Sequence, residues 1–306
     1  MQTERNVYTC EGRWQEEQRA LDNGAPVAEV HPGPKKLAFV FSGGGTLGCI
    51  QVGVAEALLE YGIYPDLIVG TSVGALNGAW LALYPHLDGI RRLKEIWASL
   101  KADSIFTGGH RLALLRLLLG RDHLYTNEGL RELITRLRRD ITFEDLSLPL
   151  YVTAADLDTG ELAVFHEGPL APAILASTAI PGVFPSVTID GHAYFDGGVL
   201  SSCCIEAAWK GGATHIVVIH CPSAPPKQGY GILGPIGRAL WASVARLCQL
   251  EVERFQERCP TLFLCPEVDI GPFRLKDLSR TVKLMEQAKR WTAETLRNPV
   301  NVSWRP

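Results

Sequence analysis

The feature that most constrains this chain is a repeated unit in which a short apolar run ends in glycines and a helical pattern follows. Residues 37–41 are apolar throughout, SGGGTLG comes next, and apolar residues then recur at helical spacing (Ile50, Val54, Leu58 and Tyr61). A second apolar run, PDLIV at residues 65–69, leads into GTSVG and another helical pattern. Wholly apolar strands that alternate with helices are typical of a parallel sheet covered on both faces.

The same alternation continues along the chain. Further apolar runs predict strands at 148–156, 161–165, 214–221 and 261–265, and a last helix is expected near Leu278, Val282 and Met285. Residues 1–34 are polar, and the stretch HPGPKK at 31–36 indicates an extension that enters the domain. We therefore predict one α/β domain at 35–306, with a mostly parallel central sheet, preceded by an N-terminal extension at 1–34.

Composition excludes several classes of function. Hydrophobic residues make up 46% of the chain, charged residues 21%, and the net charge is -3, which offers no basic surface for nucleic acid. The eight cysteines show no metal-ligand spacing, so we expect scattered thiols in a reduced compartment, without a metal site. The N-terminus lacks an apolar leader and no apolar run spans a bilayer, so we expect a cytoplasmic protein that contacts membranes at most peripherally.

Two very apolar segments, 111–120 and 230–250, fit the core pattern less well. Core-facing helices are the simpler interpretation of both. The alternative is an apolar rim around a site for an acyl chain. In the second segment Ile236, Leu240, Val244 and Leu247 would share one helix face.

The glycine loop fits a dinucleotide fingerprint only in part. Gly43, Gly45 and Gly48 match the G-x-G-x-x-G spacing between a strand and a helix. Such a site also needs an acidic residue after the second strand, to reach the ribose hydroxyls. Asp66 comes before that strand, so we predict no nucleotide and no other cofactor.

The second strand ends instead in a G-x-S-x-G pattern centred on Ser72. Gly70 and Gly74 flank this serine at a tight turn from strand to helix, where a nucleophile elbow sits. An attacked ester would develop an oxyanion that needs N–H donors, and both glycine turns open helices at neighbouring strand ends. The predicted donors of this oxyanion hole are Gly43, Gly44, Gly45 and Val73.

A serine hydroxyl requires a general base, for which the residues offer two kinds of candidate. His192, His215 and His220 are plausible by position, and His220 follows an apolar strand. The stretch YFDGG at 194–198 instead indicates that Asp196 is held rigidly at a strand end by Gly197 and Gly198.

Four motifs in this order resemble the patatin-like phospholipases: SGGGTLG, GTSVG, ASTAIPGVFP at 176–185, and DGG. The resemblance covers about residues 36–221. It implies a three-layer α/β/α fold and a Ser–Asp dyad without histidine. Ser72 would be the nucleophile and Asp196 the general base, and the substrates would be glycerolipids or other fatty-acyl esters.

Two departures from the family pattern stand beside this resemblance. Leu47 occupies a position where the family usually carries a basic residue, and VLSSCCIEAA follows the DGG motif. Neither departure changes the dyad. The leading hypothesis is a serine acyl hydrolase, and the alternatives are an acyltransferase with the same dyad or a catalytically silent lipid-binding protein.

Overall fold

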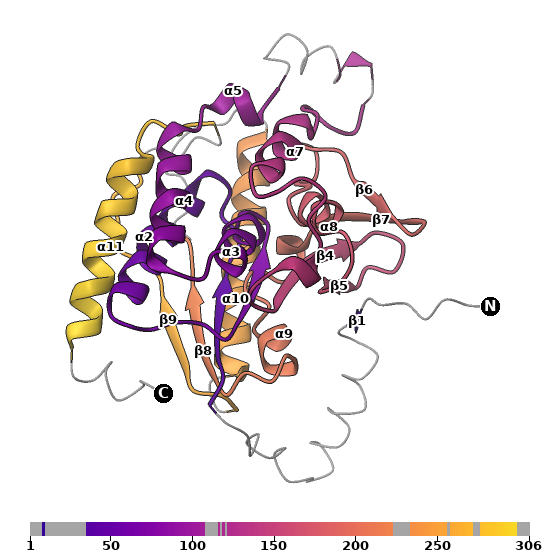
Figure 1. The fold of residues 1–306 in the computed structure, drawn as a ribbon. Helices are drawn as coiled ribbons and strands as arrows, with labels where there is room; N and C mark the ends of the chain where they lie inside the picture. The colour runs from indigo at the N-terminus through magenta and orange to yellow at the C-terminus, as the bar shows by residue number, and fades with distance from the viewer. Residues whose placement is uncertain are drawn as a thin grey trace.

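The computed structural model describes residues 8–9, 35–107, 116, 118–119, 121–222, 233–255, 258–271 and 276–298 (Figure 1). The strands are β1 (Tyr8–Thr9), β2 (Leu37–Phe41), β3 (Leu67–Thr71), β4 (Leu150–Asp156), β5 (Leu162–Phe165), β6 (Val187–Ile189), β7 (His192–Asp196), β8 (His215–Ile219) and β9 (Thr261–Leu264). The longer helices are α2 (Gly48–Glu60), α3 (Val73–Leu83), α4 (Leu87–Ser99), α7 (Glu128–Thr135), α8 (Leu170–Ser177), α10 (Leu233–Phe255) and α11 (Thr281–Arg297). Shorter helices are α5 (Ala102–Ile105) and α9 (Ile205–Lys210).

These strands form one sheet with a parallel centre and antiparallel additions. The order β4-β3-β2-β8-β9 is parallel throughout, as the apolar runs predicted. β5 pairs antiparallel with β4 on the side away from β3. β7 pairs antiparallel with the last residues of β4, on the same side as β3. The antiparallel additions were not predicted, because periodicity alone does not give strand direction.

Side chains along the central strands alternate between two apolar layers. Leu37, Phe39 and Phe41 of β2 belong to one buried cluster with residues of α2, α3, α4 and α11. Ala38 and Val40 belong to a second cluster with residues of α9 and α10. Figure 1 shows these two groups of helices on opposite faces of the sheet. The predicted three-layer α/β/α architecture is confirmed.

The N-terminal extension contributes one described element. Tyr8 and Thr9 of β1 pair with Val164 and Ala163 of β5, at the edge of the sheet. The other residues of 1–34 lie outside the described part of the chain, so the domain boundary at 34/35 stays a prediction. None of the helices in the described ranges is both long and apolar enough to cross a membrane.

The two apolar segments differ in how far they are described. Most of 111–120 lies outside the described residues. Residues 233–250 of the second segment lie in α10, where Cys248 is buried, Leu247 is half-buried and Leu250 is exposed. This helix therefore covers the second layer with one side only.

Candidate active site

Ser72 lies at a strained turn between β3 and α3. Its backbone has φ 56° and ψ -126°, a conformation that residues other than glycine rarely adopt and that costs about 1–3 kcal/mol. The turn is held from outside, because the Ser72 N–H donates to Ser177 Oγ at 2.8 Å. Ser72 is buried, and its position between strand and helix is the one the G-x-S-x-G pattern predicted.

The register of β4 explains how Asp196 reaches this serine. The last residue of β3, Thr71, lies opposite Thr153, and the last residue of β7, Asp196, lies opposite the next residue of β4, Ala154. Since β7 runs antiparallel, it approaches β3 end to end along the same side of β4. The residue after Thr71 and the residue ending β7 are therefore brought together from 124 positions apart in the chain.

The two side chains share a short hydrogen bond. Ser72 Oγ donates to Asp196 Oδ2 at 2.5 Å, and the Gly198 N–H donates to Asp196 Oδ1 at 2.8 Å. Burial raises the pKa of Asp196 to about 6, although both hydrogen bonds favour the charged form. A carboxyl group with this pKa is mostly ionised at neutral pH and is a stronger base than an exposed aspartate.

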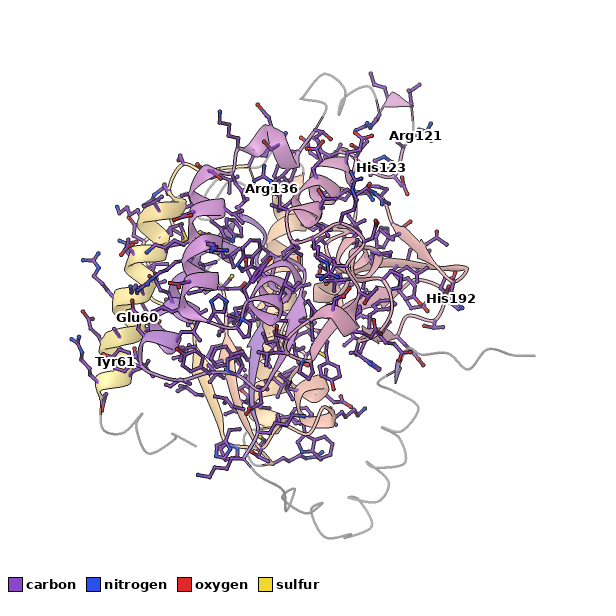
Figure 2. All side chains as sticks on the ribbon, in the orientation of Figure 1. Glu60, Tyr61, Arg121, His123, Arg136 and His192 are labelled. Atoms are coloured by element: carbon purple, nitrogen blue, oxygen red, sulfur yellow. A yellow bond between two sulfur atoms is a disulfide. The ribbon has the colours of Figure 1, made fainter. Side chains whose placement is uncertain are left out.

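The histidines proposed by position make other contacts. His220 Nδ1 lies 3.7 Å from the sulfur atoms of Cys203 and Cys248, which belong to the second apolar layer. His215 pairs with Thr214, and His192 lies 3.2 Å from Asp156 at the outer edge of β6 and β7 (Figure 2). The hydrogen bonds of the described residues link Ser72 Oγ to Asp196 and to none of these three rings.

The glycine loop lies beside the serine, and its N–H groups differ in availability. The Gly43 N–H donates to the Ser202 carbonyl at 3.1 Å, so it is already occupied. Gly45 has φ 56°, and within the described chain neither its N–H nor that of Gly44 has an acceptor. Val73 opens α3, where the first N–H groups have no acceptor within the helix.

Other residues support this geometry and were not predicted individually. The segment 176–185 forms hydrogen bonds to the backbone of both Ser72 and Asp196. Ser177 Oγ accepts the Ser72 N–H, and the Ala179 carbonyl accepts the Asp196 N–H at 3.1 Å. On the other side, Asn77 Nδ2 donates to the Gly48 carbonyl, and its Oδ1 accepts from Trp97 Nε1. In the sequence, the sign that Asn77 has a structural role is that it is a polar residue within an apolar helical pattern. Leu47 packs in the first apolar layer and brings no charge to the loop.

Gly74 allows α3 to approach β2 closely. A methyl group at this position would lie against the Phe41 carbonyl oxygen and 2.7 Å from the Ser42 oxygen, both backbone atoms. Gly70, Gly197 and Gly198 also lie next to the dyad, and the last two begin the 3₁₀ turn Gly197–Val199.

Gly74→Ala is expected to destabilise the protein by roughly 2–3 kcal/mol, because packed backbone has to move to admit the methyl group. The measurement is the midpoint of urea unfolding. Gly78→Ala is the control on the same helix and should cost less, since the atoms nearest to a methyl group there are side-chain atoms, Ile68 Cγ2 at 2.9 Å and Leu150 Cδ1 at 3.4 Å. Equal stability of the two variants would contradict this account of the turn.

An apolar cavity of about 90 Å³ opens beside Ser72 on the α3 side of the sheet. Ser72, Val73, Gly45 and Thr46 line one part of it, and the remaining wall is mostly apolar. That wall includes Leu76, Trp80, Trp97, Phe106, Leu130, Leu133 and Phe184. Arg136, after the end of α7, is the charged residue among the lining side chains, and it is exposed (Figure 2).

The site can be compared with known proteins at the level of sequence. A family model described as Patatin-like phospholipase matches residues 39–209, which is more than half of the chain. Patatin-like phospholipase domain-containing protein 7 of Rattus norvegicus is 31% identical over 185 residues, and protein 6 of Homo sapiens is 29% identical. Each match covers 60% of this chain but only 13% of the relative.

Solved structures give a weaker likeness. VipD from Legionella pneumophila has a TM-score of 0.48 and 16% identity, covering 87% of this chain and 67% of that one. Human GIVD cytosolic phospholipase A2, in complex with a fluorophosphonate inhibitor, has a TM-score of 0.41 and 13% identity, covering 100% of this chain and 66% of that one. On the match of the family model over residues 39–209, this chain belongs to the patatin-like phospholipase family.

Proposed function

We propose that this protein is a serine acyl hydrolase that cleaves fatty-acyl esters through an acyl-enzyme on Ser72. The observation that carries the proposal is the 2.5 Å hydrogen bond from Ser72 Oγ to Asp196 at the wall of an apolar cavity. A nucleophile and a base in direct contact, beside a compartment for a hydrocarbon chain, suit this reaction.

In the acylation step, Asp196 accepts the hydroxyl proton while Ser72 Oγ attacks the ester carbonyl carbon. The carbonyl oxygen becomes an oxyanion, the ester C–O bond then breaks, and the alcohol leaves with the proton returned by Asp196. In the second step water loses a proton to Asp196 and attacks the acyl-serine. The bond from the acyl carbon to Ser72 Oγ then breaks, Asp196 returns the proton to Ser72 Oγ, and the fatty acid is released.

The developing oxyanion needs preorganised donors. We assign this role to the N–H groups of Gly44, Gly45 and Val73, because they lack acceptors in the loop and at the start of α3. Gly43 was predicted to share the role. Its N–H is committed to Ser202, so in our proposal it anchors the loop instead.

The apolar wall supports a hydrocarbon chain as the acyl group, since each buried methylene contributes about 0.8 kcal/mol. Peripheral contact with a lipid surface is part of the same proposal. Leu118 and Leu119 expose 75% and 66% of their surface, which suits contact with lipid better than with water.

The test is a panel of esters of increasing acyl length, offered with and without a lysolipid acceptor. We expect release of free fatty acid, fastest for chains long enough to fill the cavity. Transfer to the acceptor in place of hydrolysis would favour an acyltransferase. Absence of turnover together with lipid binding would favour a catalytically silent protein.

Leu133→Trp is expected to shift the preference toward short acyl chains, because the indole would occupy part of the cavity. Excluding two methylenes costs about 1.6 kcal/mol, so kcat/KM for a long-chain ester should fall roughly tenfold or more relative to a butyrate ester. Leu148→Trp is the matched control, since Leu148 is half-buried outside the cavity. An equal effect of both variants would contradict the placement of the acyl chain.

A further inference from the structure

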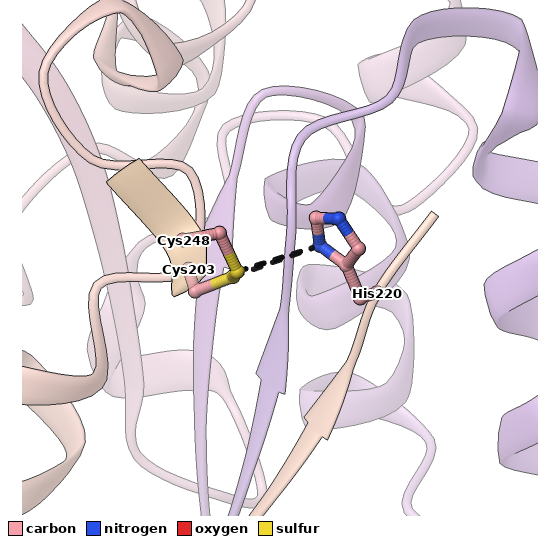
Figure 3. Close-up of side chains that lie close together, drawn as sticks. All are labelled: Cys203, His220 and Cys248. Carbon is pink, nitrogen blue, oxygen red and sulfur yellow. Dashed lines mark hydrogen bonds between the residues drawn. A yellow bond between two sulfur atoms is a disulfide. The ribbon is translucent and has the colours of Figure 1, made fainter. Parts of the chain in front are cut away.

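A second group of reactive side chains lies in the layer opposite the cavity. Cys203 and Cys248 form a disulfide, and His220 Nδ1 lies 3.7 Å from each sulfur atom (Figure 3). All three side chains are buried. The prediction that the cysteines are scattered thiols is therefore wrong for this pair, because the fold joins residues 45 positions apart.

The chemistry of the group favours a disulfide over a metal centre. Its two sulfur atoms and one imidazole nitrogen lie within 4.8 Å of one another, and no fourth His, Cys, Asp or Glu of the described chain joins them. A structural zinc site takes four protein ligands, and both sulfur atoms here are bonded to each other.

The disulfide is connected to the glycine loop through the segment 201–204. Cys203 neighbours Ser202, whose carbonyl accepts the Gly43 N–H. On the other side, Ser201 Oγ donates to Glu251 Oε1 of α10 at 2.7 Å and accepts the Cys204 N–H at 2.9 Å. The segment is thus joined to α10 by the disulfide and by hydrogen bonds from Ser201 Oγ and from the backbone of Cys203 and Cys204 to the Glu251 carboxylate.

We propose that Cys203–Cys248 is a reversible disulfide whose reduction by a small dithiol loosens segment 201–204 and lowers catalysis at Ser72. The effect on catalysis rests on the proposed function. In the oxidised form α10 anchors the Ser202 carbonyl, and that carbonyl holds Gly43. In the reduced form the covalent link is gone, and the hydrogen bonds to the Glu251 carboxylate hold the segment to α10.

The reduction balances with the dithiol as the only co-reactant. Because both sulfur atoms are buried, the exchange follows local opening of α10. One thiolate of the dithiol then attacks Cys248 Sγ, the S–S bond breaks, and Cys203 leaves as a thiolate. The second thiol then displaces Cys248, so that the dithiol becomes a cyclic disulfide and its two protons end on the two cysteines.

Two features suit exchange rather than permanent crosslinking. Burial lowers the pKa of His220 to about 4, so at neutral pH its ring is uncharged and offers one donor and one acceptor nitrogen. With the proton on Nδ1, it can hydrogen-bond either released sulfur. The other five described cysteines are thiols, which is the state expected where dithiol reductants operate.

The test compares protein treated with oxidised glutathione and protein treated with dithiothreitol. We expect mass spectrometry to find a peptide linked through Cys203 and Cys248 only in the oxidised sample. On reduction, amide hydrogen exchange across residues 42–48 should become faster, and ester hydrolysis should fall about tenfold. The double variant Cys203→Ser/Cys248→Ser should behave as the reduced form in both samples, whereas Cys259→Ser, which alters another buried thiol, should respond like the parent protein.

The proposal is overturned if the oxidised protein lacks the linked peptide, or if one equivalent of zinc is bound and lost in the double variant. It is also overturned if exchange across 42–48 is equal in the two redox states. The measurements of peptide linkage, zinc content and amide exchange do not require ester turnover. If no form hydrolyses esters, the proposed function fails, while peptide linkage and amide exchange still decide the fate of the disulfide.

Discussion

Ser72→Ala is expected to lower kcat for ester hydrolysis by at least about 10³-fold while leaving the fold intact. In the proposed mechanism the substitution removes the atom that forms the acyl-enzyme, and only binding and oxyanion stabilisation remain. The Ser72 N–H still donates to Ser177, so the turn keeps its outer support. The measurement is initial rate on a long-chain ester, beside a thermal unfolding curve.

Ser72→Gly provides a second reading of the same position. Glycine adopts φ 56° without strain, so this variant should be equally inactive but more stable than Ser72→Ala. If the alanine variant kept near-full activity, another nucleophile would have to carry the reaction. If the glycine variant were the less stable of the two, the strain at the elbow would be refuted.

Asp196→Asn is expected to lower kcat by about 10²–10⁴-fold, because an amide accepts no proton from Ser72. The parent enzyme should lose activity as the pH falls through about 6, where Asp196 becomes protonated, with a tenfold loss per pH unit below that value. A pH–rate profile from pH 4 to 9 measures this. An unchanged rate in Asp196→Asn, or a flat profile, would contradict the role of this carboxylate.

The stability of Asp196→Asn distinguishes a loss of catalysis from a loss of folding. The pKa of Asp196 is higher in the folded protein than its ordinary value of 3.8, so the folded state binds the proton more tightly. Stability therefore falls as pH rises from about 4 to 6, and ionised Asp196 costs on the order of 3 kcal/mol above that range. Asp196→Asn removes this cost, so at pH 8 it should unfold no earlier than the parent.

The sequence was sufficient to predict the parallel centre of the sheet and the elbow. Wholly apolar runs such as residues 37–41 occur where both faces of a strand are covered, and both faces of β2 are covered. The G-x-S-x-G pattern predicted the turn, because glycines at 70 and 74 are needed where α3 packs against strand backbone.

The meeting of Ser72 with Asp196 was implied only by the family resemblance. Spacing in the chain does not say that β7 runs antiparallel along β4 and ends opposite Ala154. The same limit applies to Cys203 and Cys248, whose pairing depends on how α10 lies over the segment after the DGG motif.

The central claim is that Ser72 is activated by Asp196 and by no histidine. Its most direct test is the rate at which a long-chain fluorophosphonate labels Ser72, read as an adduct on the peptide that contains it. We predict labelling of the parent protein, none in Ser72→Ala, labelling slowed at least about 10²-fold in Asp196→Asn, and a rate within about tenfold of the parent in His220→Asn. Full labelling of Asp196→Asn together with loss of labelling in His220→Asn would contradict the account and put a histidine-dependent site in its place.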